Sequence, residues 1–257
     1  MKCFDLSGRV AFVTGGSRGL GLEFSEGLAE AGADLFLTAR NADKLAPVAE
    51  EIAKKYGRRV EWTTADIESE AEMQSAADLC VEKFGKIDIL INCAANGRIN
   101  KPAEETTLAE WREVMIPNLD GAFIVATIIG RQMIKQGYGK VVNIASMSGI
   151  IINKGFHGGS YDVSKAGIVA FSKALAEEWA KYNINVNTLA PGYFLTYVNE
   201  EFFEKDPEAR KIAEELSPMK RCGRPEEIRG AIVFLASDAA SFMQGSVVVV
   251  DGGYTIY

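Results

Sequence analysis

The chain has 257 residues, of which 47% are hydrophobic and 25% are charged, and its formal net charge at pH 7 is −7. These values are typical of a globular protein, and an acidic balance without a basic stripe argues against a nucleic-acid partner. The four cysteines form no Cys-x-x-Cys pair and the chain has one histidine, so we expect no metal site.

Strand-like and helix-like segments alternate along the whole chain. Short runs rich in β-branched and aromatic residues predict strands at 10–14, 34–38, 59–63, 87–92, 140–144, 185–190 and 246–251. Apolar residues at spacings of three and four predict helices at 20–31, 42–56, 69–84, 119–136, 161–182 and 225–236. This alternation predicts an α/β fold, a doubly wound, Rossmann-type, seven-stranded parallel sheet with helices on both faces.

The chain shows no linker, internal repeat, signal-peptide pattern or apolar run long enough to span a membrane. We therefore expect a single domain over residues 1–257, located in the cytoplasm without a membrane partner. In an open parallel sheet the ligand binds beyond the carboxyl ends of the strands, so the residues that end each strand are the first candidates for a site.

The first strand runs directly into the glycine-rich turn Thr14-Gly15-Gly16-Ser17-Arg18-Gly19-Leu20-Gly21, and a helix follows. Glycines there permit a tight turn and a close approach of the main chain to a pyrophosphate, which the amides of the helix N-terminus favour. The spacing departs from the commoner dinucleotide fingerprint, and a plain tight turn is the alternative. Its position after the first strand favours a nucleotide.

The second strand is followed by Ala39 and Arg40, where a carboxylate would bind the free 2′-hydroxyl of NAD. A guanidinium binds phosphate through charge-assisted hydrogen bonds, so Arg40 and Arg18 favour NADP(H), with NAD(H) still possible. The alternative is that both arginines are ordinary surface charges.

A later segment reads Tyr161-Asp162-Val163-Ser164-Lys165, and a helix would place the phenol and the ammonium on one face. A close positive charge stabilises a phenolate and makes the phenol a better proton donor. Tyr161 would then exchange a proton with a substrate oxygen. Taken alone, this spacing is also common among surface residues.

Together these motifs, in this order, resemble the short-chain dehydrogenase/reductase family from Leu6 to the closing Val250-Asp251-Gly252-Gly253. The segment Asn92-Cys93-Ala94-Ala95 resembles the family's Asn-Asn-Ala-Gly, and Pro191-Gly192 with Thr196 resembles its nicotinamide loop. The resemblance implies cofactor contacts from Gly15, Ser17, Arg18, Gly19, Leu20, Gly21, Arg40, Asp66, Ile67, Asn92, Ala94, Tyr161, Lys165, Pro191, Gly192 and Thr196.

The same resemblance implies a catalytic set of four residues. Tyr161 would be the general acid and base, Lys165 would hold the nicotinamide ribose, Ser146 would orient the substrate carbonyl and Asn118 would anchor a relay water. Two hydroxyl donors aimed at the substrate oxygen stabilise the transition state more than the ground state. Ser148 competes with Ser146, and we favour Ser146 because it directly ends its predicted strand.

The substrate side is expected to include Ser146, Ser148, His157, Tyr161 and Tyr193, with substrate loops at 147–160 and 192–220. The first loop resembles that of relatives acting on polyols, keto sugars and sugar acids, including the gluconate dehydrogenase group. This favours hydride transfer between nicotinamide and a secondary alcohol or ketone. The alternatives are reduction of a 3-oxoacyl thioester or another carbonyl, and a non-catalytic NADP(H)-sensing regulator.

Several residues depart from the family pattern or have two interpretations. Cys93 and Ala95 replace an asparagine and a glycine, and Pro117 is expected to force Ile116 out of helical geometry. Arg98 and Lys101 are interpreted as solvated surface charges, with contact to an anionic substrate as the alternative. His157 would either contact a hydroxyl or carboxylate of the substrate or be a solvated turn residue. Three aromatic residues would either line a pocket or pack a mobile segment onto the protein: Tyr193, Phe194 and Tyr197.

The resemblance also implies a homotetramer built on the helices at 119–136 and 161–182, with the C-terminal strand region in a second contact.

Overall fold

Seven parallel strands form one sheet in the order β3-β2-β1-β4-β5-β6-β7 within residues 1–157 and 159–256, which the computed structural model describes. All six pairings between neighbouring strands are parallel, as expected from the alternating sequence. The strands are β1 (Val10–Thr14), β2 (Asp34–Ala39), β3 (Val60–Thr64), β4 (Ile89–Asn92), β5 (Gly139–Ile144), β6 (Ile184–Pro191) and β7 (Val247–Val250).

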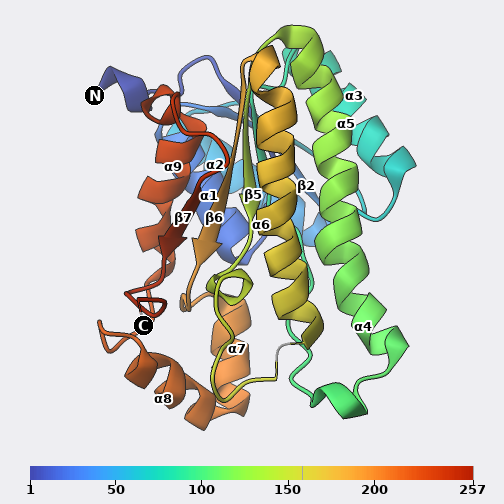
Figure 1. The fold of residues 1–257 in the computed structure, drawn as a ribbon. Coiled ribbons are helices and arrows are strands. Elements are labelled where there is room, and N and C mark those ends of the chain that lie inside the picture. The colour runs from blue at the N-terminus through green and yellow to red at the C-terminus, as the bar shows by residue number, and fades with distance from the viewer. Residues whose placement is uncertain (158, 257) are drawn as a thin grey trace.

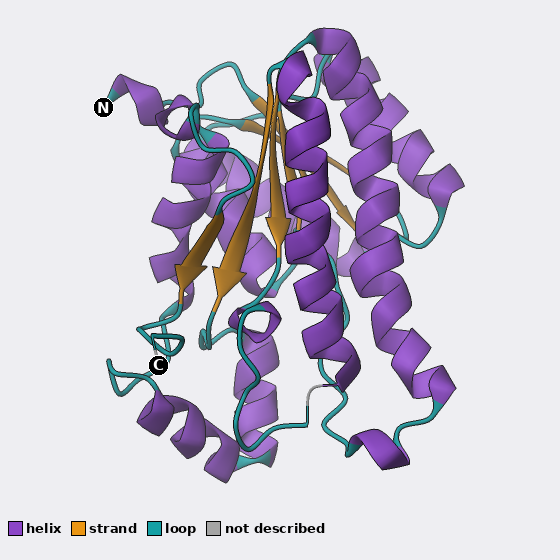
Figure 2. Cartoon of the chain, viewed as in Figure 1, coloured by secondary structure: helices purple, strands orange, loops and turns teal. Residues whose placement is uncertain are grey.

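Helices cover both faces of the sheet, so the predicted doubly wound, single-domain architecture is confirmed (Figure 1). The helices are α1 (Gly19–Glu30), α2 (Ala42–Tyr56), α3 (Glu70–Phe84), α4 (Leu108–Met115), α5 (Gly121–Gln136), α6 (Gly159–Trp179), α7 (Tyr197–Lys205), α8 (Pro207–Leu216) and α9 (Arg229–Ala236). The strand arrows in Figure 2 point toward α7 and α8, which lie beyond the carboxyl ends of the sheet.

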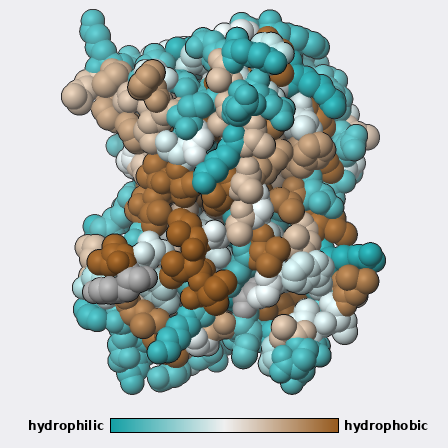
Figure 3. Space-filling view, viewed as in Figure 1, coloured by the Kyte–Doolittle hydropathy of each residue, from teal (hydrophilic) through white to brown (hydrophobic). Residues whose placement is uncertain are grey.

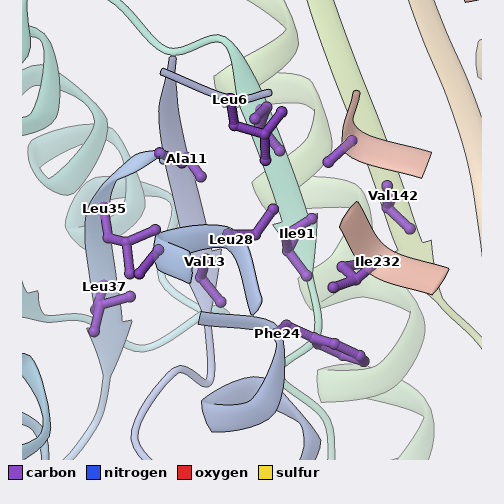
Figure 4. Packing of buried hydrophobic residues seen from close by; sticks show 14 of the residues in the cluster. Leu6, Ala11, Val13, Phe24, Leu28, Leu35, Leu37, Ile91, Val142 and Ile232 are labelled. Carbon is purple, nitrogen blue, oxygen red and sulfur yellow. The ribbon is translucent and has the colours of Figure 1, made fainter. Parts of the chain in front are cut away.

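Alternating side chains along the strands bury both faces of the sheet. In β1, Ala11 and Val13 pack with apolar residues of α1, α2 and α9, as Figure 4 shows for Val13 beside Leu28 of α1. Val10 and Phe12 point the other way, into a cluster with α3, α5 and α6. A strand buried on both faces needs a continuous apolar run, which is the pattern that the sequence of β1 carries.

The prediction that Pro117 forces Ile116 out of helical geometry is wrong. Ile116 has φ −61° and ψ −58°, and the chain stays helical because a π-turn over Ile116–Asp120 joins α4 to α5. A proline removes the amide that would bond the carbonyl four residues earlier, here that of Glu113. The side chain of Asn96 donates to this carbonyl instead, at 3.0 Å. The wider π-turn thus accommodates the proline ring, and the side chain of Asn96 replaces the missing amide donor.

The continuous helical stretch Leu108–Gln136 is long and apolar enough to cross a membrane by length and composition alone. In the fold, 56% of its apolar window is buried. Residues such as Val125 and Met133 lie in the core cluster shared with α3 and α6. We therefore identify it as a core helix.

Two segments expected as loops differ from expectation. The segment at 192–220 contains α7 and α8, which pack through a small apolar cluster that includes Phe156, Phe203, Ala209 and Ala213. The segment at 147–160 begins with a short 3-10 turn, Met147–Gly149, and α6 starts at Gly159. Residue 158 of this segment, like residue 257, lies outside the described residues.

Candidate active site

The glycine-rich turn after β1 takes a conformation that needs glycine. Gly15 and Gly19 have φ of +72° and +57°, in the left-handed region where side chains are disfavoured. A Cβ on Gly21 would collide with the carbonyl oxygen of Gly15, and one on Gly15 would lie 3.1 Å from Cα of Ala94. The three glycines therefore let α1 start directly against the end of β1.

A cavity of about 510 Å³ opens beside this turn, over the carboxyl ends of β1, β2 and β4. Most of the predicted cofactor residues line it, namely Gly15, Ser17, Arg18, Gly19, Leu20, Gly21, Arg40, Asp66, Ile67, Ala94 and Thr196. Lys44, in the first turn of α2, adds a third cation to Arg18 and Arg40. Within residues 1–157 and 159–256, none of these three cations takes part in an ion pair.

The cavity fits a nicotinamide dinucleotide. Within residues 1–157 and 159–256, no atom outside the neighbouring backbone lies within 4 Å of the position where a Cβ would stand on Gly19, so the main chain there is open to a ligand. The first amides of α1 face the same space, and helix N-termini favour phosphate. When bound, such a cofactor supplies hydride chemistry.

Asn92 does not line this cavity, contrary to the sequence-based expectation. Its side-chain amide donates to the carbonyl of Ala122 at 2.8 Å and to Oδ1 of Asn143 at 3.1 Å. Asn92 therefore ties β4 to α5 and β5. A glycine is required at position 192 for packing, because a Cβ there would lie 2.7 Å from Cα of Asp251.

Asn118 lies in the π-turn and is 2% exposed. Its Oδ1 accepts from the main-chain amide of Asn96 at 2.7 Å, and its Nδ2 donates to the carbonyl of Asn96 at 3.1 Å and to the hydroxyl of Ser164 at 3.1 Å. Asn118 thus joins the loop after β4 to α6. Asn96 was missed in the sequence analysis, although it directly follows the Asn92-Cys93-Ala94-Ala95 segment.

Ser146 and Ser148 both follow the end of β5. Ser146 directly precedes the 3-10 turn Met147–Gly149, and Ser148 lies within it. The amide of Ser148 donates to Oγ of Ser146 at 3.2 Å. Gly149, which closes the turn, packs against α6 so closely that a Cβ would lie 2.6 Å from the carbonyl carbon of Lys165. The two serines are thereby fixed relative to the turn of α6 that carries Tyr161 and Lys165.

We predict that Gly149→Ala lowers kcat about tenfold, because the new methyl group pushes the serine-bearing turn away from α6. Cofactor affinity, measured by tryptophan fluorescence, should change little. Gly230→Ala in α9 is the matched control, since a Cβ there meets no atom within 4 Å in the described chain apart from the backbone of its own helix turn. An unchanged kcat in Gly149→Ala would contradict the argument.

Tyr161 and Lys165 lie one helical turn apart on α6, as their spacing predicts. The ammonium of Lys165 donates to the carbonyl of Ile144, the last residue of β5, at 3.0 Å and lies 5.6 Å from the centre of the Tyr161 ring. A second cation, the guanidinium of Arg98, lies 5.2 Å from the same ring centre. Two cationic side chains therefore lie near the ring of Tyr161.

Arg98 is not a solvated surface residue, so that interpretation is wrong. Its side chain is 14% exposed, and Nη2 donates to a carboxylate oxygen of Asp162 at 2.7 Å and to Oγ of Ser148 at 3.0 Å. Asn153 donates to the same hydroxyl at 2.6 Å. Burial raises the pKa of the Asp162 carboxyl, while the charge of Arg98 acts in the opposite direction. The network lies directly beside Tyr161.

The other predicted substrate residues divide into two groups. Tyr193 packs among the rings of Phe156, Phe203 and Tyr254, and burial raises the pKa of its phenol. His157 is exposed and its main-chain amide donates to Asn100 at 2.8 Å. The ammonium of Lys101 forms an ion pair with a carboxylate oxygen of Glu110 at 3.0 Å. Tyr197 is 62% exposed. Of these residues, Tyr193 is the one held within a cluster of aromatic rings.

Cys93 lines the cavity beside Ala94 and Ala95, and the amides of Cys93 and Ala94 both donate to the hydroxyl of Thr14. Burial raises the pKa of the Cys93 thiol to about 11, with the charge of Lys165 opposing. The thiol is therefore a neutral packing group. Among residues 1–157 and 159–256 no group of three metal-binding side chains occurs.

A glycine turn at a helix N-terminus, a dinucleotide-sized cavity at the carboxyl edge of a parallel sheet and a tyrosine-lysine pair beside it define the class. The fold and site are those of a nicotinamide-dependent oxidoreductase. A family model described as enoyl-(acyl carrier protein) reductase matches residues 15–255. The chain belongs to the short-chain dehydrogenase/reductase family.

Individual relatives match over almost the whole chain. A galactitol 2-dehydrogenase (L-tagatose-forming) of Cereibacter sphaeroides is 41% identical over 99% of this chain and 98% of its own. A 3-oxoacyl-[acyl-carrier-protein] reductase of Aquifex aeolicus is 38% identical over 96% and 98%. The crystal structure of a gluconate 5-dehydrogenase from Burkholderia cenocepacia in complex with NADP and tartrate has a TM-score of 0.93, with 35% identity over 99% and 98%.

Proposed function

We propose that this protein is an NADP-preferring enzyme that interconverts a secondary alcohol and a ketone on a sugar acid, a keto sugar or a polyol. The observation that carries the proposal is the guanidinium of Arg98, held beside Tyr161 with its Nη1 buried and without a hydrogen-bond partner in the described chain. A buried donor without a partner costs free energy unless a ligand oxygen meets it. A substrate rich in oxygen would do so.

Two of the four candidate catalytic residues act on the substrate oxygen, and the other two support them. Tyr161 donates or accepts the proton there, and Ser146 donates a second hydrogen bond as negative charge develops. Lys165, anchored at the end of β5, places its positive charge beside the phenol and would hold the nicotinamide ribose. Asn118 would hold the water that restores the proton.

The preference for NADP(H) rests on charge. Arg18, Arg40 and Lys44 line one end of the cavity without anionic partners in the described chain, and α2 begins there. Arg40 and Lys44 at the N-terminus of α2, together with Arg18 at that of α1, suit a 2′-phosphate, and β2 ends in Ala39 without the carboxylate that a free 2′-hydroxyl would use. Pro191, the last residue of β6, and Gly192 after it would contact the nicotinamide together with Thr196.

Two other functions are distinguished by their substrates. A 3-oxoacyl thioester reductase has support from the Aquifex relative, but such a substrate has few oxygen atoms to meet Arg98. A regulator that binds NADP(H) without turnover has no support from the site, because Tyr161 and Lys165 share one turn of α6 and the turn that carries Ser146 packs against it.

The test is oxidation of NADPH and NADH by the purified protein with keto sugars, keto acids, diketones and 3-oxoacyl thioesters. The reverse reaction uses polyols and sugar acids with NADP⁺. Turnover on a polyhydroxylated compound supports the proposal. Faster turnover on the thioester would favour the second function, and tight NADPH binding with no turnover on any compound would favour the regulator.

We also propose a cytoplasmic homotetramer. On one face, Phe123 of α5 and Val163 of α6 are 53% and 48% exposed, although both helices are otherwise core elements. Figure 3 also shows apolar surface where the edge strand β7 runs, and Phe242, in the loop before that strand, is fully exposed. Exposed apolar faces of this kind favour association. Light scattering of the purified protein should give four times the mass of 27.9 kDa.

A further inference from the structure

Asp162 is a buried carboxylate beside the reacting phenol, and the proposed proton and hydride transfers do not use it. It follows Tyr161 on α6, and its side chain is 7% exposed. Burying a carboxylate costs several kcal/mol unless a partner compensates it, and the partner here is Arg98 at 2.7 Å. A charge kept at such a cost next to a substrate site calls for a functional explanation.

The ion pair changes what Arg98 offers to a substrate. An unpaired guanidinium would present a full positive charge and attract a carboxylate. Paired with Asp162, it remains a directed hydrogen-bond donor through Nη1, but its charge is already balanced. A substrate carboxylate bound at Nη1 would also lie close to the carboxylate of Asp162, and like charges at close range in a buried site repel strongly.

Three buried polar atoms near this pair have no hydrogen-bond partner in the described chain: Nη1 of Arg98, Oδ1 of Asn153 and the hydroxyl of Tyr254. Asn153 is linked to Arg98 through the hydroxyl of Ser148, to which both side chains donate. The ring of Tyr254 packs against that of Tyr193, and the charge of Arg98 acts to lower the pKa of the Tyr254 phenol, against the effect of burial. They comprise a donor, an acceptor and a group that does both. Neutral hydroxyl groups, each a donor and an acceptor, match this set better than a carboxylate, which only accepts.

We propose that Asp162 is a specificity-determining residue that balances the charge of Arg98, so that the site selects neutral polyols and their ketoses over sugar acids. Asp162 acts through Arg98, as a positioning and neutralising residue. The inference rests on the proposed function and narrows its substrate class. Selection against the acid is by repulsion, a common means of specificity.

The experiment compares two substrates that differ at one carbon, galactitol and galactonate, with NADP⁺ as the oxidant. For the wild type we expect kcat/KM to favour galactitol at least tenfold. In Asp162→Asn the repulsion is gone and Arg98 keeps its charge, so kcat/KM for galactonate should rise about tenfold, mainly through KM. For galactitol it should fall, because the guanidinium loses its anchor. A purely structural role would lower both values.

Three further variants separate the causes. Asp162→Glu restores the negative charge and should restore the preference for galactitol. Asp162→Asn combined with Arg98→Gln removes both charges and should lose the gain on galactonate without leaving a buried ion unpaired. Glu61→Gln, which breaks the exposed pair with Arg59 on β3, is the control for a lost carboxylate and should leave the ratio unchanged.

Two results would overturn the inference alone: a wild type that prefers galactonate, or the same galactitol-to-galactonate ratio in wild type and Asp162→Asn. The preference of the wild type is measured without any variant, so the inference can be refuted even if Asp162→Asn fails to fold. Absence of tyrosine-dependent turnover on any polyol, ketose or sugar acid would instead overturn the proposed function, and the inference with it. Turnover on either compound upholds the proposed function whatever the ratio.

Discussion

In the Tyr161→Phe variant we expect carbonyl reduction with NADPH to fall by a factor of about 10² to 10⁴, the usual contribution of a positioned general acid. The change removes one hydroxyl and keeps the ring against which Lys165 and Arg98 lie. NADPH affinity should therefore stay within about threefold of the wild type, since little cofactor contact is lost. Steady-state kinetics and a fluorescence titration measure the two effects separately.

Tyr182→Phe is the matched control, because it removes a phenol hydroxyl from the short 3-10 turn that follows α6 at the far end from the site. It should leave turnover and binding unchanged. Wild-type turnover in Tyr161→Phe would refute the assignment of the proton donor. Loss of NADPH binding in the same variant would mean that the phenol is chiefly a cofactor contact.

The sequence was sufficient for the sheet because each strand carries its own signal. A run such as Val10-Ala11-Phe12-Val13 is apolar on both sides, and the register then follows from packing against helices on both faces. The spacing of Tyr161 and Lys165 likewise depends on one helix alone. Features encoded within a single element were predictable.

Features that depend on distant partners were not predictable in the same way. Arg98 follows a strand and is one charge among many in the sequence, and its burial arises from Asp162 and Ser148, which lie 64 and 50 residues away. Pro117 indicates a helix break, yet a π-turn and Asn96 keep the helix continuous. The helices α7 and α8 are held by an apolar cluster drawn from several segments.

The second large effect is expected from Arg40→Ala, in the part of the cavity beside the start of α2. Hydrogen bonds to charged groups contribute about 1.5 to 3 kcal/mol, so the Kd for NADPH should rise about tenfold to a hundredfold. The Kd for NADH should stay nearly constant, because NADH has no 2′-phosphate for the guanidinium to bind. The difference should shrink at high salt, since Arg40 is exposed and its charge is screened.

Lys54→Ala removes an exposed cation from the last turn of α2, away from the cavity, and serves as the control for net charge. If long-range attraction of an anionic cofactor were responsible, both variants would weaken NADPH binding alike, and the Arg40 assignment would fail. Equal losses for NADPH and NADH in Arg40→Ala would also contradict it, because they would locate Arg40 at a part that both cofactors share. A loss confined to NADPH and to Arg40 is the pattern that only direct contact with the 2′-phosphate produces.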